Sequence, residues 1–192
     1  DLEEMGLVTS PHTSAGRMPT DKGYRYYVDV LLSQMVLLED EKQRITREYS
    51  RQLNKLEDIL ERASQVLSDF TRCAGIVSSF DRIYYKGAAF MTEYQEFNDV
   101  QRIRDILMFL EEKEQLLNVF NRNLEKKINI YIGYESACKE IADCSLIIST
   151  YNVEDKPLGR LAVLGPRSMN YEHIIPTVEY ISELVGRALE NL

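Results

Sequence analysis

Residues 145–164 read SLIISTYNVEDKPLGRLAVL, and this stretch decides the fold class. Ser145 to Tyr151 is rich in β-branched residues, and Leu161 to Leu164 is a second apolar run. Both runs have the length and composition of strands. The polar residues Asn152 to Gly159 between them are typical of a turn that joins antiparallel neighbours. The sequence therefore predicts an antiparallel hairpin.

Helical and strand-like patterns alternate around this hairpin. From about Glu39 to Arg72, apolar residues recur at alternating steps of four and three, as in a coiled-coil seam that Gln52 interrupts once. A second long helix is predicted from Asp99 to about Lys127. The shorter elements are strands at 75–77, 83–85 and 128–132, a helix that begins after the cap Thr20, and a closing helix over 171–192. This order predicts an α+β fold.

The chain has 192 residues and a formal net charge of −8, with 44% hydrophobic and 28% charged residues. That length fits one large domain or two small ones with a real core. No apolar run approaches the roughly 20 residues of a membrane span, and no export signal is visible, although the chain begins mid-pattern at Asp1. The acidic total argues against non-specific nucleic-acid binding by the whole molecule, but not against one local basic contact.

Residues suited to catalysis or metal binding are scarce. The two histidines, His12 and His173, have no second histidine or cysteine at ligand spacing. Cys73, Cys138 and Cys144 are odd in number and form no C-x-x-C pair, which fits inert thiols in a reduced cytosolic protein. No glycine-rich phosphate loop is present. The sequence predicts no catalytic residue, no metal site and no cofactor, and an enzyme is the least favoured class.

The N-terminal part of the chain carries a polar cluster that is a candidate nucleic-acid contact. Asp1 to Gly6 has the pattern of a helix end, and Leu7 to Pro19 that of a hairpin with a long polar tip. No acidic residue occurs from Met5 to Thr20. On composition alone, an ordinary polar turn is the alternative to a nucleic-acid contact. The tip contains four good ligands for phosphate or sugar groups: His12, Thr13, Ser14 and Arg17.

Three longer segments carry a family resemblance. They are residues 11–29, PHTSAGRMPTDKGYRYYVD; residues 102–114, RIRDILMFLEEKE; and residues 157–171, PLGRLAVLGPRSMNY, with VEYISEL following at 178–184. Together they resemble the HrcA family of heat-inducible transcription repressors. The first segment is the most specific because it is long and unusual in composition.

The resemblance implies a bacterial, cytoplasmic repressor with a winged-helix DNA-binding domain and a GAF-like domain that a dimerisation segment interrupts. A homodimer would bind the inverted-repeat CIRCE operator ahead of chaperone operons such as groE and dnaK. Heat would relieve repression, and the chaperonin GroEL would modulate the activity. Neither a membrane nor a cofactor is implied. Leu7 to Pro19 would be the wing, which places His12, Thr13, Ser14 and Arg17 at the DNA.

The resemblance divides this chain into four parts. They are the C-terminal part of the winged-helix domain (1–37), a linker helix with the start of the GAF-like domain (38–81), part of the inserted dimerisation segment (82–127) and the rest of the GAF-like domain (128–192). The family's helix-turn-helix would lie before Asp1, and its extra sequence near Phe80–Arg82 has no counterpart here. We expect weak operator binding by this segment alone. The alternative is a GAF-like sensor or dimerisation module without DNA binding of its own.

Two apolar helix stripes are candidates for the dimer contact, which would set the spacing of the two DNA-reading heads. The alternative is that both stripes pack on the core of their own domain, because helix pairs within one chain use the same spacing. The first stripe supplies Ile45, Tyr49 and Leu56, and the second supplies Ile103, Leu107 and Leu110.

Overall fold

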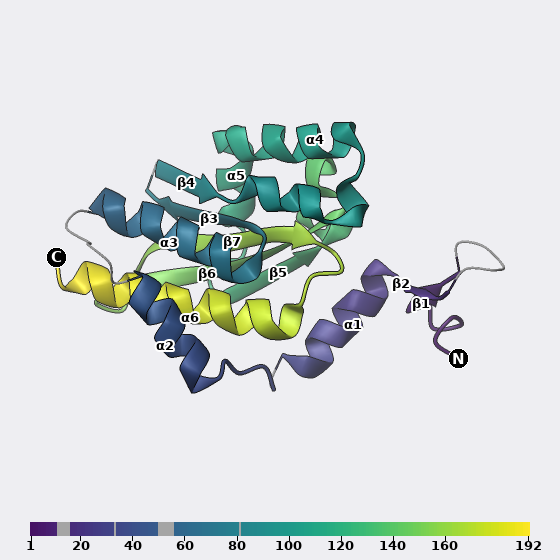
Figure 1. Ribbon diagram of the computed structural model, residues 1–192, viewed down its shortest axis with the longest axis horizontal. Coiled ribbons are helices and arrows are strands. Elements are labelled where there is room, and N and C mark those ends of the chain that lie inside the picture. Colours follow the sequence, from purple (N-terminus) through teal and green to yellow (C-terminus); the bar gives the residue numbers. More distant parts are fainter. Residues whose placement is uncertain (11–15, 33, 50–55, 81) are drawn as a thin grey trace.

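The computed structural model describes the chain except for residues 11–15, 33, 50–55 and 81. Its centre is a five-stranded antiparallel sheet in the order β4-β3-β7-β6-β5 (Figure 1). Helices cover both faces of this sheet, which confirms the predicted α+β class with an antiparallel sheet. The strands are β3 (Ala74–Ser79), β4 (Arg82–Lys86), β5 (Ile128–Ile132), β6 (Cys144–Val153) and β7 (Lys156–Pro166).

The β6–β7 hairpin forms where residues 145–164 predict it, but its turn is shorter than the polar stretch suggests. Val153 pairs with Lys156, so only Glu154 and Asp155 form the connection. Both have positive φ values, 49° and 62°, as two-residue hairpin turns require. Asn152 and Lys156 are paired within the sheet yet exposed, so their polarity reflects solvent at the strand ends.

Alternating side chains of the strands build two apolar clusters, one on each face of the sheet. Ile147 belongs to the cluster shared with α3 and α6, whereas its neighbour Leu146 belongs to the cluster shared with α4 and α5. The helices are α3 (Leu56–Thr71), α4 (Val100–Glu111), α5 (Lys113–Phe120) and α6 (Tyr171–Glu190), with short 3-10 turns η1 (Ala88–Glu93), η2 (Gln95–Phe97), η3 (Gly133–Ser136) and η4 (Lys139–Ile141).

The prediction of one continuous helix from Glu39 to Arg72 is wrong. The structure has two helices here, α2 (Glu39–Tyr49) and α3, which Figure 1 shows as separate rods. The Arg62 guanidinium donates to the carbonyl oxygen of Glu48 at 2.8 and 2.6 Å. In a straight helix, residues 14 apart would be about 21 Å apart, so the chain folds back on itself. The apolar residues keep one period from Glu39 to Arg72 because each of the two helices buries one of its faces.

The second long helix also breaks, which corrects the predicted span from Asp99 to Lys127. Asp99 caps α4 as predicted, because its side chain accepts from the backbone N–H of Gln101. The helix ends at Glu111, and Glu112, with ψ of 82°, separates it from α5. Residues 111–114 are all charged and provide no apolar anchor, so nothing holds a single helix across this point.

Arg160 in β7 ties the end of α5 to the sheet. Its residue is only 4% exposed, and its guanidinium donates to the carbonyl oxygens of Phe120, Arg122 and Asn123 and to Thr150 Oγ1. A helix end presents unpaired carbonyl oxygens with partial negative charge, which suits a cation. Burial lowers the pKa of Arg160 below its usual value.

Candidate nucleic-acid interface

A two-stranded ribbon projects beyond one end of the molecule, away from the central sheet (Figure 1). Its strands β1 (Val8–Thr9) and β2 (Met18–Pro19) pair antiparallel, as the pattern over residues 7–19 predicts. Gly6 precedes the ribbon with φ of 69°, the left-handed conformation predicted for a helix stop. His12, Thr13 and Ser14 lie outside the described residues, so their DNA contacts stay predictions.

Arg17 is the member of the predicted polar cluster that the structure describes. Its side chain is 58% exposed, and Nη2 lies 3.4 Å from Oε2 of Glu3. Ion pairs this exposed contribute little free energy, because water and salt screen both charges. A phosphate group can therefore replace Glu3 as the partner of Arg17 with little loss.

The helix α1 (Asp21–Leu31) supports the ribbon through backbone contacts. Thr20 caps this helix as predicted, because its Oγ1 accepts from the backbone N–H of Gly23 at 3.1 Å. The same hydroxyl donates to the carbonyl oxygen of Gly6 at 2.6 Å. Thr20 N also donates to the carbonyl oxygen of Leu7 at 3.0 Å. One residue thus joins helix cap and ribbon.

Gly23 lets the backbone of the ribbon lie directly on α1. A Cβ at this position would lie 3.1 Å from the carbonyl carbon of Leu7 and closer still to its oxygen. Leu7 is buried, and beside it Lys22 Nζ donates to the carbonyl oxygen of Met5 at 2.7 Å. Sequence reasoning missed Gly23, although a glycine inside a helical pattern is a signal of close backbone approach.

Ion pairs along one face of α1 fix the helix to the sheet domain. Asp21 Oδ1 accepts from the Arg167 guanidinium at 2.7 Å. Arg25 grips both carboxylate oxygens of Glu135. The sequence marked Asp21 only for its place in the first helical turn. Its partner lies 146 positions away, and no local pattern indicates it.

The six candidates for the dimer contact lie in different environments. Ile45 and Tyr49 are buried in the cluster that α3 and α6 share, and Leu56 packs partly buried against the same cluster. Leu110 is buried in the other cluster, with Ile103 packed against it. Leu107 is 40% exposed. All but Leu107 thus contact the core of their own chain, and their part in a dimer stays a prediction.

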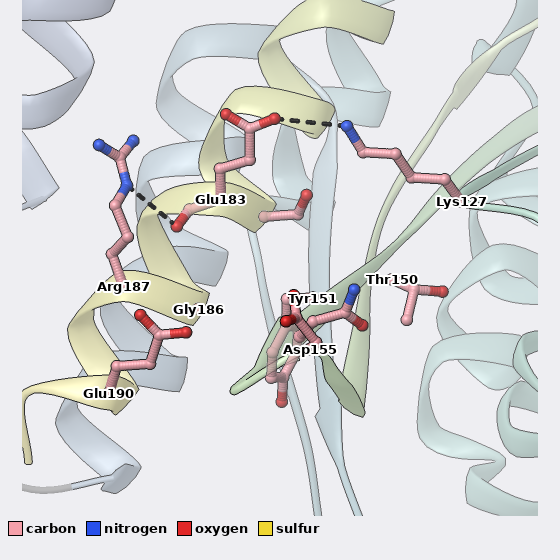
Figure 2. Close-up of a pocket in the computed structure, with 10 residues that line it drawn as sticks. Lys127, Thr150, Tyr151, Asp155, Glu183, Gly186, Arg187 and Glu190 are labelled. Carbon is pink, nitrogen blue, oxygen red and sulfur yellow. Dashed lines mark hydrogen bonds and ion pairs between the residues drawn. The ribbon is translucent and has the colours of Figure 1, made fainter.

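A polar cavity of about 330 Å³ lies between the β6–β7 hairpin and α6, at the end of the molecule opposite the ribbon. Figure 2 shows Lys127 and Arg187 on either side of Glu183. Lys127 Nζ lies 3.3 Å from Oε1 of Glu183, and Arg187 Nε donates to the Glu183 carbonyl oxygen at 3.4 Å. Lys127 is thus paired with a carboxylate, and Arg187 is hydrogen-bonded to the backbone of its own helix.

A second polar cavity, of about 640 Å³, contains a histidine–carboxylate pair. His173 lies in the first turn of α6, and its Nε2 is 2.5 Å from Oε1 of Glu41. Covalent catalysis by such a pair needs a side-chain nucleophile within hydrogen-bond reach. Among the described residues, the His173 ring has Glu41 as its hydrogen-bond partner and no serine, threonine or cysteine. In the same part of the chain, no three His, Cys, Asp or Glu side chains form a group that could hold a metal ion.

The cysteines match the prediction of inert thiols in part. Cys73 and Cys144 are buried, whereas Cys138 is half-buried. Burial raises the pKa of the Cys73 thiol to about 11, and it also raises the pKa of Cys144. Thiols with raised pKa values are poor nucleophiles near neutral pH.

Within the described part of the chain, no helix is long and apolar enough to cross a bilayer.

An exposed two-stranded ribbon, joined by one helix to an α+β domain, has the form in which β-ribbon proteins reach a DNA groove. The profile of the HrcA protein C-terminal domain matches residues 78–175, which is half of the chain. The chain belongs to the HrcA family.

Relatives named heat-inducible transcription repressor HrcA align with the whole chain. The protein of Moorella thermoacetica is 24% identical over 294 positions, covering 100% of this chain and 86% of its own length. That of Geobacter sulfurreducens is 27% identical over 292 positions, covering 100% of this chain and 85% of its own. These alignments have more positions than this chain has residues, 192, so the relatives carry segments without a counterpart here.

A solved structure has the same fold. A hypothetical protein, determined by crystallography at 2.2 Å resolution, superposes with a TM-score of 0.84 at 16% identity. The match covers 99% of this chain and 84% of the other. At this identity, the similarity supports the arrangement of the ribbon, α1 and the sheet domain, but not an activity.

Proposed function

We propose that this chain acts in a heat-inducible transcription repressor. The observation that carries the proposal is the family match over residues 78–175, together with repressors that align along the whole chain. In the finer form of the proposal, a homodimer in the bacterial cytoplasm binds the CIRCE inverted repeat ahead of chaperone operons such as groE and dnaK. Heat relieves the repression, and GroEL modulates it.

In this proposal, the ribbon binds the phosphate backbone of the DNA. Arg17 exchanges its weak ion pair with Glu3 for a phosphate, and His12, Thr13 and Ser14 contact the DNA from the tip. Phosphate contacts of this kind position a protein but do not specify sequence. Specificity therefore requires base contacts from a second element and a dimer that fixes the half-site spacing.

The four-part division of the chain belongs to the same proposal. Residues 1–37 hold the ribbon and α1, residues 38–81 lead into the sheet, and residues 128–192 complete it. The resemblance puts the inserted segment at 82–127. Because β4 pairs with β3 from Ser79↔Arg82 to Gly75↔Lys86, we propose instead that β4 belongs to the sheet and that the insertion starts at residue 87. Residues 87–127 then form the insertion, and Leu107 is its exposed apolar candidate for the dimer contact.

Heat relief follows from marginal stability. A loss of one or two kcal/mol is a large fraction of the stability of a typical domain. A modest rise in temperature can therefore dissociate the dimer or detach α1, which supports the ribbon. A repressor that stayed folded, dimeric and operator-bound through the heat-shock range without chaperonin would contradict this mechanism.

Fluorescence anisotropy tests the DNA contact on the protein that contains this chain. A duplex with the inverted repeat should bind more tightly than a scrambled duplex, with an affinity that falls linearly on a logarithmic salt scale. Arg17→Ala should weaken binding and reduce that slope by about one. Arg187→Ala, an equal charge change at the opposite end, is the control and should leave the slope unchanged. Equal slopes for both variants would remove Arg17 from the interface.

A sensor module without DNA binding is the second candidate. It is favoured by a mainly apolar cavity of about 470 Å³ between the ribbon, α1 and the start of α6. Tyr24 and Tyr171 line it, with ring centroids 6.1 Å apart. Its size and lining are those of small-molecule sites. A metabolite that raises the unfolding temperature specifically, in a protein with no preference for the inverted repeat, would favour the sensor.

A further inference from the structure

The helix α1 is joined to the rest of the molecule with little apolar burial. Of its eleven residues only Val28 is buried, whereas α3 buries eight of its sixteen. Most helices of a globular protein are held by an apolar stripe on the core. Because α1 lacks a continuous buried stripe, polar contacts must supply much of what holds it in place.

One set of polar contacts is a chain of alternating charges that starts at the first turn of α1. Asp21 Oδ1 lies 2.7 Å from Arg167, and Arg167 lies 3.4 Å from Asp143 Oδ1. Asp143 Oδ2 in turn lies 3.2 Å from Arg102 of α4. The chain of charges links α1 to the end of β7, to the residue before β6 and to the helical insertion.

A second set begins one turn further along α1. Arg25 grips the carboxylate of Glu135 with two hydrogen bonds and donates to the carbonyl oxygen of Ile130 at 2.5 Å. Glu135 is itself oriented, because its Oε2 accepts from the backbone N–H of Ile132 at 2.9 Å. Arg25 therefore meets a pre-positioned carboxylate and a strand carbonyl at the edge of β5.

The sheet domain is shaped to admit the first of these side chains. Gly133 has φ of 59°, and a Cβ there would lie 2.8 Å from the carboxyl carbon of Asp21 and closer still to Oδ2. A side chain at position 133 would thus displace Asp21. The glycine at position 133 is an observation independent of the ion pairs, and it supports the same docked position of α1.

We propose that Asp21 and Arg25 are positioning residues that set the orientation of the ribbon on the sheet domain by charge. Backbone contacts at Thr20 and Gly23 couple the ribbon to α1, and the two ion-pair sets couple α1 to the core. Half-exposed ion pairs are weakened by salt. The helix α1, with the ribbon, therefore detaches from the sheet domain before that domain unfolds. Its effect on operator binding rests on the repressor function proposed above.

Hydrogen exchange followed by mass spectrometry tests the docking itself. Asp21→Asn and Arg25→Gln should each accelerate exchange in residues 21–31 about tenfold, while β7 and α6 exchange as before. Added salt should accelerate exchange of this helix in the original protein but have little effect in the double variant. Lys127→Gln is the matched control, because it removes ion pairs to Glu179 and Glu183 elsewhere on the surface.

A double-mutant cycle shows whether the two charges act on each other. Because Arg167→Gln already removes the partner of Asp21, adding Asp21→Asn should accelerate exchange no further than Arg167→Gln alone. Unchanged exchange in the single variants, or fully additive effects in the double variant, would overturn the proposal.

Operator binding by the same variants separates this inference from the proposed function. Weaker binding that accompanies faster α1 exchange supports the positioning role, and unchanged binding overturns it. If the original protein shows no preference for the inverted repeat, the repressor function fails, and only the predicted effect on operator binding fails with it. In that case, the exchange data still decide whether charge docks α1.

Discussion

Replacing Gly23 by alanine should separate the ribbon from α1 without unfolding the sheet domain. Two effects oppose each other. In a helix, alanine is more favourable than glycine by up to about 1 kcal/mol, because glycine loses more conformational entropy. Against this gain, the new Cβ would lie 3.1 Å from the carbonyl carbon of Leu7 and closer to its oxygen. Overpacking of this kind costs about 1–3 kcal/mol.

The steric effect should win because the obstacle is backbone rather than a flexible side chain. The ribbon must move, and the 3.0 Å hydrogen bond from Thr20 N to the carbonyl oxygen of Leu7 is then lost. That bond contributes about another 1 kcal/mol, which offsets the helix gain. The net loss at this contact is about 1–3 kcal/mol, equivalent to roughly five- to 150-fold faster exchange of the Thr20 amide.

Amide exchange of Thr20 reports the contact, and thermal unfolding followed by circular dichroism reports the sheet domain. Gly16→Ala is the control, because no described atom apart from its chain neighbours lies within 4 Å of a Cβ built at that position. The control should leave both measurements unchanged. If Gly23→Ala raises the unfolding temperature and leaves the Thr20 amide protected, helix propensity has won and the steric argument is refuted.

Two further predictions concern the buried polar groups of the sheet domain. Arg160→Met should lower the free energy of unfolding, measured in urea, by about 2–3 kcal/mol, because carbonyl oxygens at the end of α5 lose a donor. An unchanged free energy of unfolding would show that water replaces the guanidinium. Burial raises the pKa of Cys73 from 9.0 to about 11 and that of Tyr151 from 10.0 to about 12. The folded state retains these protons when the unfolded chain releases them, so the contribution of these two groups to stability should be constant below about pH 9 and fall between pH 9 and 12. Stability that stays flat to pH 11 would contradict this.

Local signals in the sequence predicted local structure well. The Thr20 cap, the Gly6 stop and the hairpin over residues 145–164 each depend on neighbouring residues, and the structure confirms them. The helix over Glu39 to Arg72 was predicted as one rod, because two helices that each bury one face can share one period. Apolar periodicity reports which side is buried but not whether the chain reverses.

The arrangement around the ribbon was only partly predictable. The ribbon itself followed from turn residues and apolar pairs, whereas its support depends on contacts such as Asp21 with Arg167, 146 positions apart. A charged residue in a first helical turn has a sufficient local explanation in the helix dipole, which conceals its distant partner. Arg160 was missed for a similar reason, because its partners are backbone carbonyl oxygens and leave no mark in side-chain patterns.

Photocrosslinking tests most directly whether the ribbon is the part of the molecule that meets DNA. A photoreactive residue at position 16 of the ribbon, or at position 155 in the opposite β6–β7 turn, is placed in the protein that contains this chain and irradiated with a duplex carrying the inverted repeat. The ribbon position should crosslink to the duplex and lose this product when unlabelled repeat competes, while position 155 gives none. Crosslinks of equal yield from both positions, or from position 155 alone, would contradict the account.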